Sequence, residues 1–205
     1  MTTVAVERMQ VETEGSGEPI VMLHGLGGTS NTFCPQVLGL NGNYRTIRPD
    51  LPGAGRSPAS ASITIQSLVD MAARAARALG VERAHFVGHS MGTIVCQHIA
   101  VQQPELVKSL TLFGPIHAPA DAGRDGLKAR AAKARAEGMA GIADQIVEAT
   151  LSRDTKSAQP VAVALVREFI MRQDAEGYAR NCEALAAAEP ADLNRIKVPV
   201  RLVTG

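Results

Sequence analysis

The sequence predicts an α/β fold with a mostly parallel β-sheet, and two observations lead to this prediction. First, residues 20–23 form a short continuous apolar run, typical of a strand buried on both faces, and the patterns at 44–51 and 106–114 also predict strands. Second, residues 64–79 and 91–102 place apolar side chains at helical spacing between strand candidates. A helix between neighbouring strands is the crossover that a parallel pair requires, so this order predicts a parallel sheet with helices on its faces.

The segments around these elements fit the same plan. Residues 3–13 alternate loosely between apolar and polar side chains and predict one or two edge strands, which end at the turn EGSGEP (14–19). The strand predicted at residues 44–51 leads into PDLPGAGRS (49–57), which we call the proline turn. The first helix is expected to stop at Gly80, because glycine commonly follows a helix C-terminus.

The pattern divides the chain into three parts. Residues 1–116 contain the elements above and form the N-terminal part of the α/β core. Residues 117–190 are rich in alanine and charged side chains and almost continuously helical in pattern, so we expect an inserted helical cap. Residues 191–205 return to the core with a short helical turn and the strand segment VRLVTG.

Composition and charge disfavour several kinds of partner and site. A net charge of +1 gives no reason to expect a nucleic acid or an anionic membrane. The N-terminus shows no secretory signal, and no apolar run approaches the length of a membrane span. The three cysteines, Cys34, Cys96 and Cys182, have no CxxC spacing, so we expect neither a disulfide framework nor a zinc site. A reduced cytoplasmic setting is the expected location.

The segment HFVGHSMGTIVCQHIA (85–100) contains a candidate nucleophile, Ser90. A nucleophilic serine of this type needs a sharp turn from strand to helix, which holds its Oγ above the sheet at the helix N-terminus. The residues two before and two after must lack bulk, since strand and helix nearly touch there, and Gly88 and Gly92 occupy these places. This context favours a nucleophile over a Gly/Ser turn without chemistry.

A glycine-rich turn at residues 24–28, which we call the glycine turn, supports the prediction. Its members are His24, Gly25, Leu26, Gly27 and Gly28. Such a turn after a buried strand can direct a backbone N–H toward the oxygen that becomes negative during acyl transfer. The expected donors are the N–H groups of Leu26 and Met91, and His24 is expected to order the turn. Nucleotide binding is disfavoured, because the patterns GxxxxGK[ST] and GxGxxG are absent.

Three motifs and the expected helical cap follow one another in an order that resembles the α/β-hydrolase fold. The motifs are HGLGG, RPDLPGAGRS and VGHSMG, and the resemblance covers the whole chain. Within that superfamily, AAKARAEGMAGIADQIV (131–147) and DAEGYARNCEAL (174–185) are similar to cap segments of 3-oxoadipate enol-lactonases. The resemblance implies a mostly parallel sheet with helices on both faces, an inserted helical cap, and hydrolase chemistry without a cofactor or a metal.

The chain departs from that family in the cap and in the proline turn. Where the family's cap continues with Arg-Trp-Phe, whose arginine and tryptophan help hold the substrate, this chain has Ala149-Thr150-Leu151. Where the family's turn carries a histidine, this chain has Ala54, which we interpret as a change of loop packing and not of chemistry.

The general base and the acid of a catalytic triad are not placed by any motif in the chain. In α/β hydrolases the triad follows the order serine, acid, histidine. The resemblance therefore puts the acid after VRLVTG and the histidine after one further strand, both beyond Gly205. We accordingly expect a C-terminally truncated chain without the last strand and helix, and an inactive 205-residue fragment. Asp121 is the alternative acid within the chain.

The other histidines are poorly placed to act as the base. His98 lies eight positions along the helix from Ser90, about 12 Å of rise away. Of the remaining three, His85 begins the strand before Ser90 and His89 precedes the serine in its turn. His117 follows the strand before the cap and is a candidate pocket-lining residue.

The expected reaction is the hydrolysis of a small-molecule carboxylic ester or lactone, with an enol-lactone as a candidate, through an acyl-enzyme on Ser90. A general carboxylesterase, a hydrolase of C–C bonds and a non-catalytic small-molecule-binding homologue remain as alternatives. Five basic residues of the cap are candidates for attracting a substrate carboxylate: Lys128, Arg130, Lys133, Arg135 and Arg180. The spacing of the first four favours a solvated face instead. The oligomeric state stays open.

Overall fold

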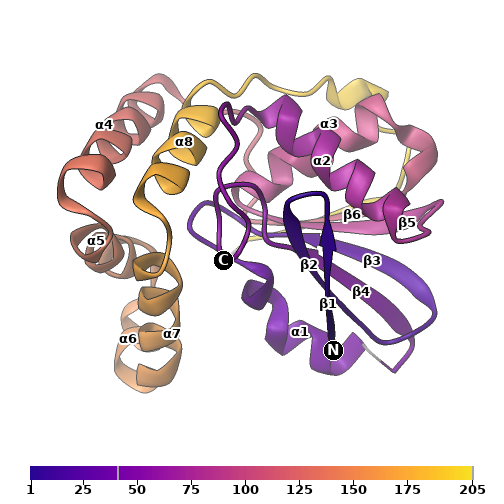
Figure 1. Ribbon diagram of the computed structural model, residues 1–205, viewed down its shortest axis with the longest axis horizontal. Helices are drawn as coiled ribbons and strands as arrows, with labels where there is room; N and C mark the ends of the chain where they lie inside the picture. Colours follow the sequence, from indigo (N-terminus) through magenta and orange to yellow (C-terminus); the bar gives the residue numbers. More distant parts are fainter. Residues whose placement is uncertain (41, 205) are drawn as a thin grey trace.

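The computed structural model describes residues 1–40 and 42–204, and a mixed β-sheet forms its centre (Figure 1). Within these residues the sheet has seven strands in the order β1-β2-β4-β3-β5-β6-β7. The β1–β2 and β2–β4 pairs are antiparallel, and all the other pairs are parallel. The strands are β1 (Thr2–Val6), β2 (Met9–Glu14), β3 (Glu18–Leu23), β4 (Tyr44–Pro49), β5 (Ala84–His89), β6 (Val107–Phe113) and β7 (Val200–Val203). The predicted α/β fold is confirmed.

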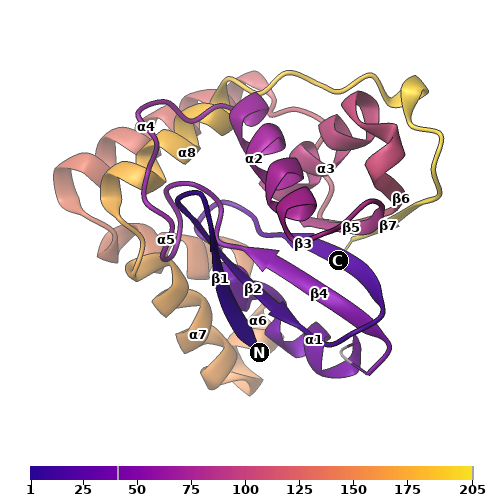
Figure 2. The same cartoon turned by 45° about the vertical axis from the view of Figure 1, so that its right-hand side comes forward.

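Three helices cover the two faces of the sheet. α2 (Ile65–Ala78) and α3 (Met91–Gln102) lie on one face, and α1 (Cys34–Leu40) lies on the other (Figures 1 and 2). α2 and α3 match the predicted helices, and the Thr64 hydroxyl caps α2 by accepting from the Ser67 N–H at 3.0 Å. α1 was not predicted, because its sequence CPQVLGL contains a proline and a glycine and buries a single side chain, that of Val37.

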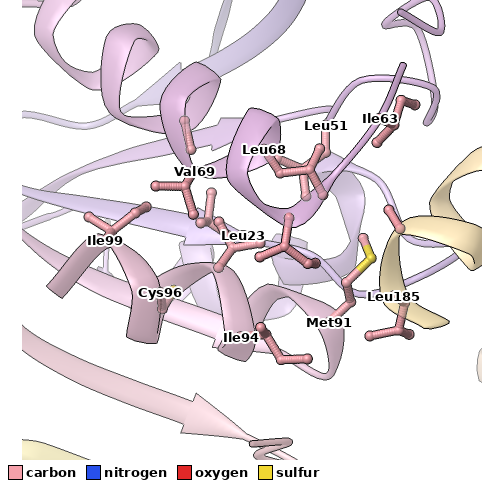
Figure 3. Packing of buried hydrophobic residues seen from close by; sticks show 14 of the residues in the cluster. Leu23, Leu51, Ile63, Leu68, Val69, Met91, Ile94, Cys96, Ile99 and Leu185 are labelled. Atoms are coloured by element: carbon pink, nitrogen blue, oxygen red, sulfur yellow. The ribbon is translucent and has the colours of Figure 1, made fainter. Parts of the chain in front are cut away.

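Side chains of β3 alternate between the two layers of the core. Val21 and Leu23 pack beneath α2 and α3, while Ile20 and Met22 belong to the smaller cluster under α1. Figure 3 shows Leu23 in the same cluster as Leu68 of α2 and Ile94 of α3. A strand buried on both faces explains why IVML reads as a continuous apolar run.

Five helices form a second layer that leans over one end of the sheet (Figure 1), and we call this layer the cap. They are α4 (Asp121–Glu137), α5 (Ala140–Thr150), α6 (Arg153–Ala158), α7 (Pro160–Met171) and α8 (Ala175–Ala186). α4 and α8 pack side by side through small buried residues such as Ala131, Ala134 and Ala179. Arg135 of α4 bridges Glu176 and Glu183 of α8. The predicted helical pattern is therefore present.

After the cap, the chain returns to the sheet. A 3-10 turn (Leu193–Arg195) precedes β7, which pairs in parallel with β6. Val200 and Leu202 on β7 are 46% and 61% exposed. Gly205, the last residue of the predicted segment VRLVTG, lies outside the described residues.

In the described part of the chain, the helices are all too short or too polar to cross a membrane.

Candidate active site

Ser90 stands at the junction of β5 and α3 with a strained backbone. Its φ of 51° and ψ of −118° are unfavourable for a residue with a side chain, and among the described residues only Glu7 shares a positive φ without being glycine. Neighbouring groups hold this conformation in place. The Ser90 N–H donates to the Phe113 carbonyl at 3.0 Å, and the Thr93 hydroxyl donates to the Ser90 carbonyl at 2.6 Å.

Gly88 and Gly92 are required by the close approach of strand and helix. A Cβ on Gly92 would lie 2.2 Å from the carbonyl oxygen of Leu23, and a Cβ on Gly88 would lie 2.6 Å from that of Gly92. Neither distance is compatible with a real side chain, so α3 can rest on β3 and β5 only with glycine at both positions. The two glycines that the sequence singled out are thus needed for the turn that holds Ser90.

The glycine turn lies directly against Ser90. The Gly28 N–H donates to the Gly25 carbonyl at 3.0 Å, and Gly27 has a φ of +76°, as the third residue of a type II turn requires. A Cβ on Gly25 would lie 2.9 Å from the Cβ of Ser90. The fold therefore brings together two segments that are more than sixty residues apart in the sequence.

Two backbone donors beside Ser90 have no acceptor. Within the described residues, no hydrogen bond engages the N–H of Leu26 or that of Met91, the first residue of α3. Leu26 and Met91 line the same small recess. An oxyanion that formed beside Ser90 would require unpaired N–H groups of this kind.

His24 connects the glycine turn to the proline turn. Its Nε2 accepts from the Leu51 N–H at 2.9 Å, so Nδ1 carries the proton and donates to the Gly25 carbonyl at 2.8 Å. The ring is buried, and desolvation holds the pKa of His24 below its ordinary value even though the Gly25 carbonyl acts in the opposite direction. Both ring nitrogens of this neutral imidazole are occupied, so His24 orders the turn and cannot accept a proton.

The other histidines are also directed elsewhere. His98 and His117 each place Nε2 3.0 Å from a backbone carbonyl, that of Glu189 and that of Ala191 respectively. His85 places Nδ1 2.7 Å from the Ser109 hydroxyl. His89 is next to Ser90 in the chain, and desolvation lowers the pKa of its imidazole. No hydrogen bond joins any of these rings to Ser90 within residues 1–40 and 42–204, and Asp121 is an exposed residue at the start of α4.

A buried carboxylate that the sequence analysis did not single out holds the proline turn. Asp50 is 1% exposed and accepts from the Ser30 N–H at 2.6 Å, and from the Arg56 Nε at 2.9 Å and the Arg56 N–H at 3.1 Å. Burial alone would raise the pKa of Asp50, but these hydrogen bonds outweigh it and lower the pKa. The motif RPDLPGAGRS contains both residues, six apart, but their pairing depends on the turn that the chain makes between them.

A second ion pair lies beneath this carboxylate. Arg48 and Glu12 are almost fully buried and 3.2 Å apart, and Arg48 also donates to the Ser30 carbonyl at 3.2 Å. The same guanidinium lies 3.2 Å from the Sγ of the half-buried Cys34. These contacts fix the segment that follows the glycine turn.

On the other side of Ser90, two polar residues of α3 hold the loop after β6. The Thr93 hydroxyl accepts from the Ile116 N–H at 3.0 Å, and the Gln97 amide donates to the Ile116 carbonyl at 2.8 Å. Their spacing of four places them on one face of α3, but nothing in the sequence shows that this face meets a loop and not the apolar core.

The basic residues of the cap do not gather into one site. Lys128 and Lys133 form ion pairs with Asp125 and Glu137 of their own helix, α4, and Arg135 pairs with Glu176 of α8. Arg180 binds Glu176 and the carbonyl groups of Ser60 and Ala61. Arg130 is half-buried near Tyr178. Within the described residues, no group of three or more His, Cys, Asp or Glu side chains could hold a metal ion.

Comparison with known proteins agrees with this architecture. The family model for the alpha/beta hydrolase fold matches residues 18–152, and the chain belongs to this family. The crystal structure of the enol-lactonase from Burkholderia xenovorans LB400 superimposes with a TM-score of 0.90 and 30% sequence identity, covering 100% of this chain and 81% of that one. The 3-oxoadipate enol-lactonase 1 of Acinetobacter baylyi is 27% identical over 198 residues, 96% of this chain and 74% of the relative.

Other curated relatives are matched over shorter segments. The (E)-2-((N-methylformamido)methylene)succinate hydrolase of Acinetobacter baylyi is 32% identical over 119 residues, which are 58% of this chain and 45% of that hydrolase. The chain spans less than half the length of this and several other curated relatives that it matches.

The close approach at Gly92 generates a stability prediction. Gly92→Ala should lower the free energy of unfolding by at least about 3 kcal/mol, because the new methyl group forces α3 away from β3. Gly126→Ala, on the open surface of α4, is the matched control and should be neutral or stabilising by up to about 1 kcal/mol. Denaturant unfolding followed by circular dichroism measures both. A Gly92→Ala variant as stable as the parent protein would contradict the assignment.

The buried neutral His24 generates a pH prediction. Since burial lowers its pKa in the folded state, the unfolded chain binds the proton more readily as the pH falls below the ordinary imidazole value of about 6.5. Stability should therefore decrease from neutral pH toward pH 5. His24→Gln should reduce this slope by up to about 1.4 kcal/mol per pH unit. Unfolding free energies at several pH values test this, and an unchanged slope in His24→Gln would refute it.

Proposed function

We propose that this chain carries the nucleophile and the oxyanion site of a serine hydrolase that acts on a carboxylic ester or a lactone. The observation that supports this most strongly is the strained Ser90 backbone beside two N–H groups without acceptors. A strained backbone conformation costs stability and persists at sites where it has a use. Membership of the hydrolase family and the proximity of the glycine turn to Ser90 support the same reaction class.

In the proposed reaction, the Ser90 Oγ attacks the carbonyl carbon of the substrate while its proton passes to a general base. The carbonyl oxygen becomes negative and accepts hydrogen bonds from the N–H groups of Leu26 and Met91. Removal of one such donor typically costs about 3–4 kcal/mol of transition-state stabilisation. The C–O bond to the leaving group then breaks, and water hydrolyses the acyl-serine.

We assign the general base and the acid of this reaction to no residue between 1 and 204. The described histidine side chains form their hydrogen bonds elsewhere or form none with Ser90. A longer protein that contains this chain would supply both groups, and the experiments below therefore use the protein as the cell produces it.

A small-molecule enol-lactone is the proposed substrate class. One relative and one solved structure that align over almost the whole chain, cap included, are named enol-lactonases. An enol leaving group suits the mechanism, because it relaxes to a ketone after the C–O bond breaks. Ala149, Thr150 and Leu151 offer no cation for the substrate at the place where the sequence departs from enol-lactonases, so the specificity must come from other residues of the cap.

Covalent labelling tests the nucleophile. A fluorophosphonate should form one adduct at Ser90: the Oγ–P bond forms, the P–F bond breaks, fluoride leaves and the hydroxyl proton goes to the general base. Intact-mass measurement and peptide mapping should find the label on the peptide that contains Ser90. Ser90→Ala should abolish labelling. Ser67→Ala removes a serine at the start of α2 and should leave labelling unchanged.

The result separates the proposed enzyme from a non-catalytic relative. A folded protein that binds small ligands but shows no adduct would refute the nucleophile and favour a binding protein on the hydrolase fold. An adduct on a serine other than Ser90 would refute the assigned site.

Substrate comparison tests the reaction class. An enol-lactone should give the highest kcat/KM, followed by simple aryl esters, while a ring-fission product with a scissile C–C bond should react slowest. The physical reason is that the first two present an acyl carbon with an oxygen leaving group. Steady-state kinetics with the three substrates measure this order. Preference for the C–C substrate would assign the protein to a different hydrolase class.

A further inference from the structure

Gln173 links the cap to the glycine turn and to the proline turn at once. It lies between α7 and α8 and is 6% exposed. Its Nε2 donates to the Gly27 carbonyl at 3.2 Å and to the Phe169 carbonyl at 2.8 Å. Its Oε1 accepts from the Gly55 N–H at 3.2 Å. One amide group therefore connects three segments.

The chemistry at this position requires an amide. Two carbonyl oxygens face Nε2 and one N–H faces Oε1, so the side chain must be a donor at one end and an acceptor at the other. A carboxylate of the same shape would set negative oxygens against the carbonyls of Gly27 and Phe169. An apolar side chain would leave the buried Gly27 carbonyl without this donor, and would also remove the partner of the Phe169 carbonyl and of the Gly55 N–H.

Apolar contacts around this amide close the same junction. A Cβ on Gly27 would lie 3.3 Å from Ile170 of α7 and from the ring of Tyr178 of α8, so these cap residues pack tightly onto the turn. Gln173 and Tyr178 line the narrow recess that also contains Leu26 and Met91. In Figures 1 and 2 the junction of α7 and α8 lies beside the loops at the edge of the core.

From this arrangement we propose that Gln173 is a positioning residue for the oxyanion site. By holding the Gly27 carbonyl, it fixes the type II turn and with it the direction of the Leu26 N–H, two peptide units away. Among the described residues, Gln173 is the cap side chain that hydrogen-bonds to the glycine turn. The inference rests on the proposed function, because the oxyanion site is itself part of that proposal. Gln173 does not touch the reacting atoms.

The expected effect is on kcat more than on KM. Complete loss of an oxyanion donor lowers kcat by about 100- to 1,000-fold, so a donor that is misdirected part of the time should cost about 10- to 100-fold. Gln173→Glu and Gln173→Met should both show this loss, with KM changed less than about threefold, since the substrate-binding surface of the cap is retained. Rates are corrected for the folded fraction from the unfolding curve.

The pH profile of Gln173→Glu separates a positioning role from a merely structural one. A protonated glutamic acid again has a donor and an acceptor, so the ratio of variant to wild-type kcat should rise as the pH is lowered. The same ratio for Gln173→Met should stay constant, because its side chain does not titrate. If the ratio of variant to wild-type kcat is the same for both variants and does not change with pH, the proposal is overturned.

Arg124→Gln is the matched control for general loosening of the cap. Arg124 of α4 holds the end of α8, at the carbonyls of Ala186 and Ala188, but it does not contact the glycine turn. It should leave kcat unchanged after correction for the folded fraction. A loss of kcat as large as that of the Gln173 variants would show that any weakening of the cap has this effect, and would overturn the proposal.

A readout without chemistry keeps this test separate from that of the proposed function. Backbone amide exchange at residues 26–28 should be faster in Gln173→Met than in the parent protein, while exchange in α2 stays the same. If the fluorophosphonate does not label Ser90, the proposed function fails, and amide exchange still shows whether Gln173 holds the turn. Unchanged exchange at residues 26–28 would overturn the proposal whatever the enzymatic result.

Discussion

The contact between the backbone of α3 and the end of β3 sets the geometry of the whole site. Only a glycine at position 92 lets the helix come as close to the Leu23 carbonyl as it does. Leu23 is the last residue of β3, so the chain enters the glycine turn directly below the start of α3. Ser90 and Gly25 are neighbours for this reason. The strain at Ser90 is the cost of the contact, and the hydrogen bonds from Thr93 and to Phe113 stabilise it.

The turns around Ser90 have no regular secondary structure, and buried polar groups make them rigid. A buried carboxylate such as Asp50 is costly unless it is paired and hydrogen-bonded, and its bonds to Ser30 and Arg56 meet this condition. The neutral His24 joins the same two turns from the other side. This network binds the turns to each other, while no hydrogen bond within the described residues engages the N–H groups of Leu26 and Met91 beside Ser90.

Much of this fold could be predicted from the sequence because its signals are local. The apolar run of β3, the helical spacing of α2 and the two glycines around Ser90 each reflect a constraint within a few residues. The missed features depend on contacts across the chain. α1 lacks an apolar stripe, and its place follows from the sheet face that it covers. The hydrogen bond from Gln173 to the Gly27 carbonyl joins residues that are 146 positions apart, and no periodic pattern in the sequence indicates such a contact.

The contacts of the cap divide it into an anchored and a free part. α8 is held by Gly177 against Gly53, by the Asn181 amide on the Pro52 carbonyl at 2.9 Å, and by Gln173. α6 has no buried residue, and Val161 near the start of α7 is 80% exposed. Movement of the whole cap as one lid would break several buried hydrogen bonds, whereas movement of α6 and the adjoining end of α7 breaks none of them. In the proposed hydrolase, substrate access through the free part would therefore leave the turns at Ser90 undisturbed, so the same layer could select the substrate and keep the proposed oxyanion site in place.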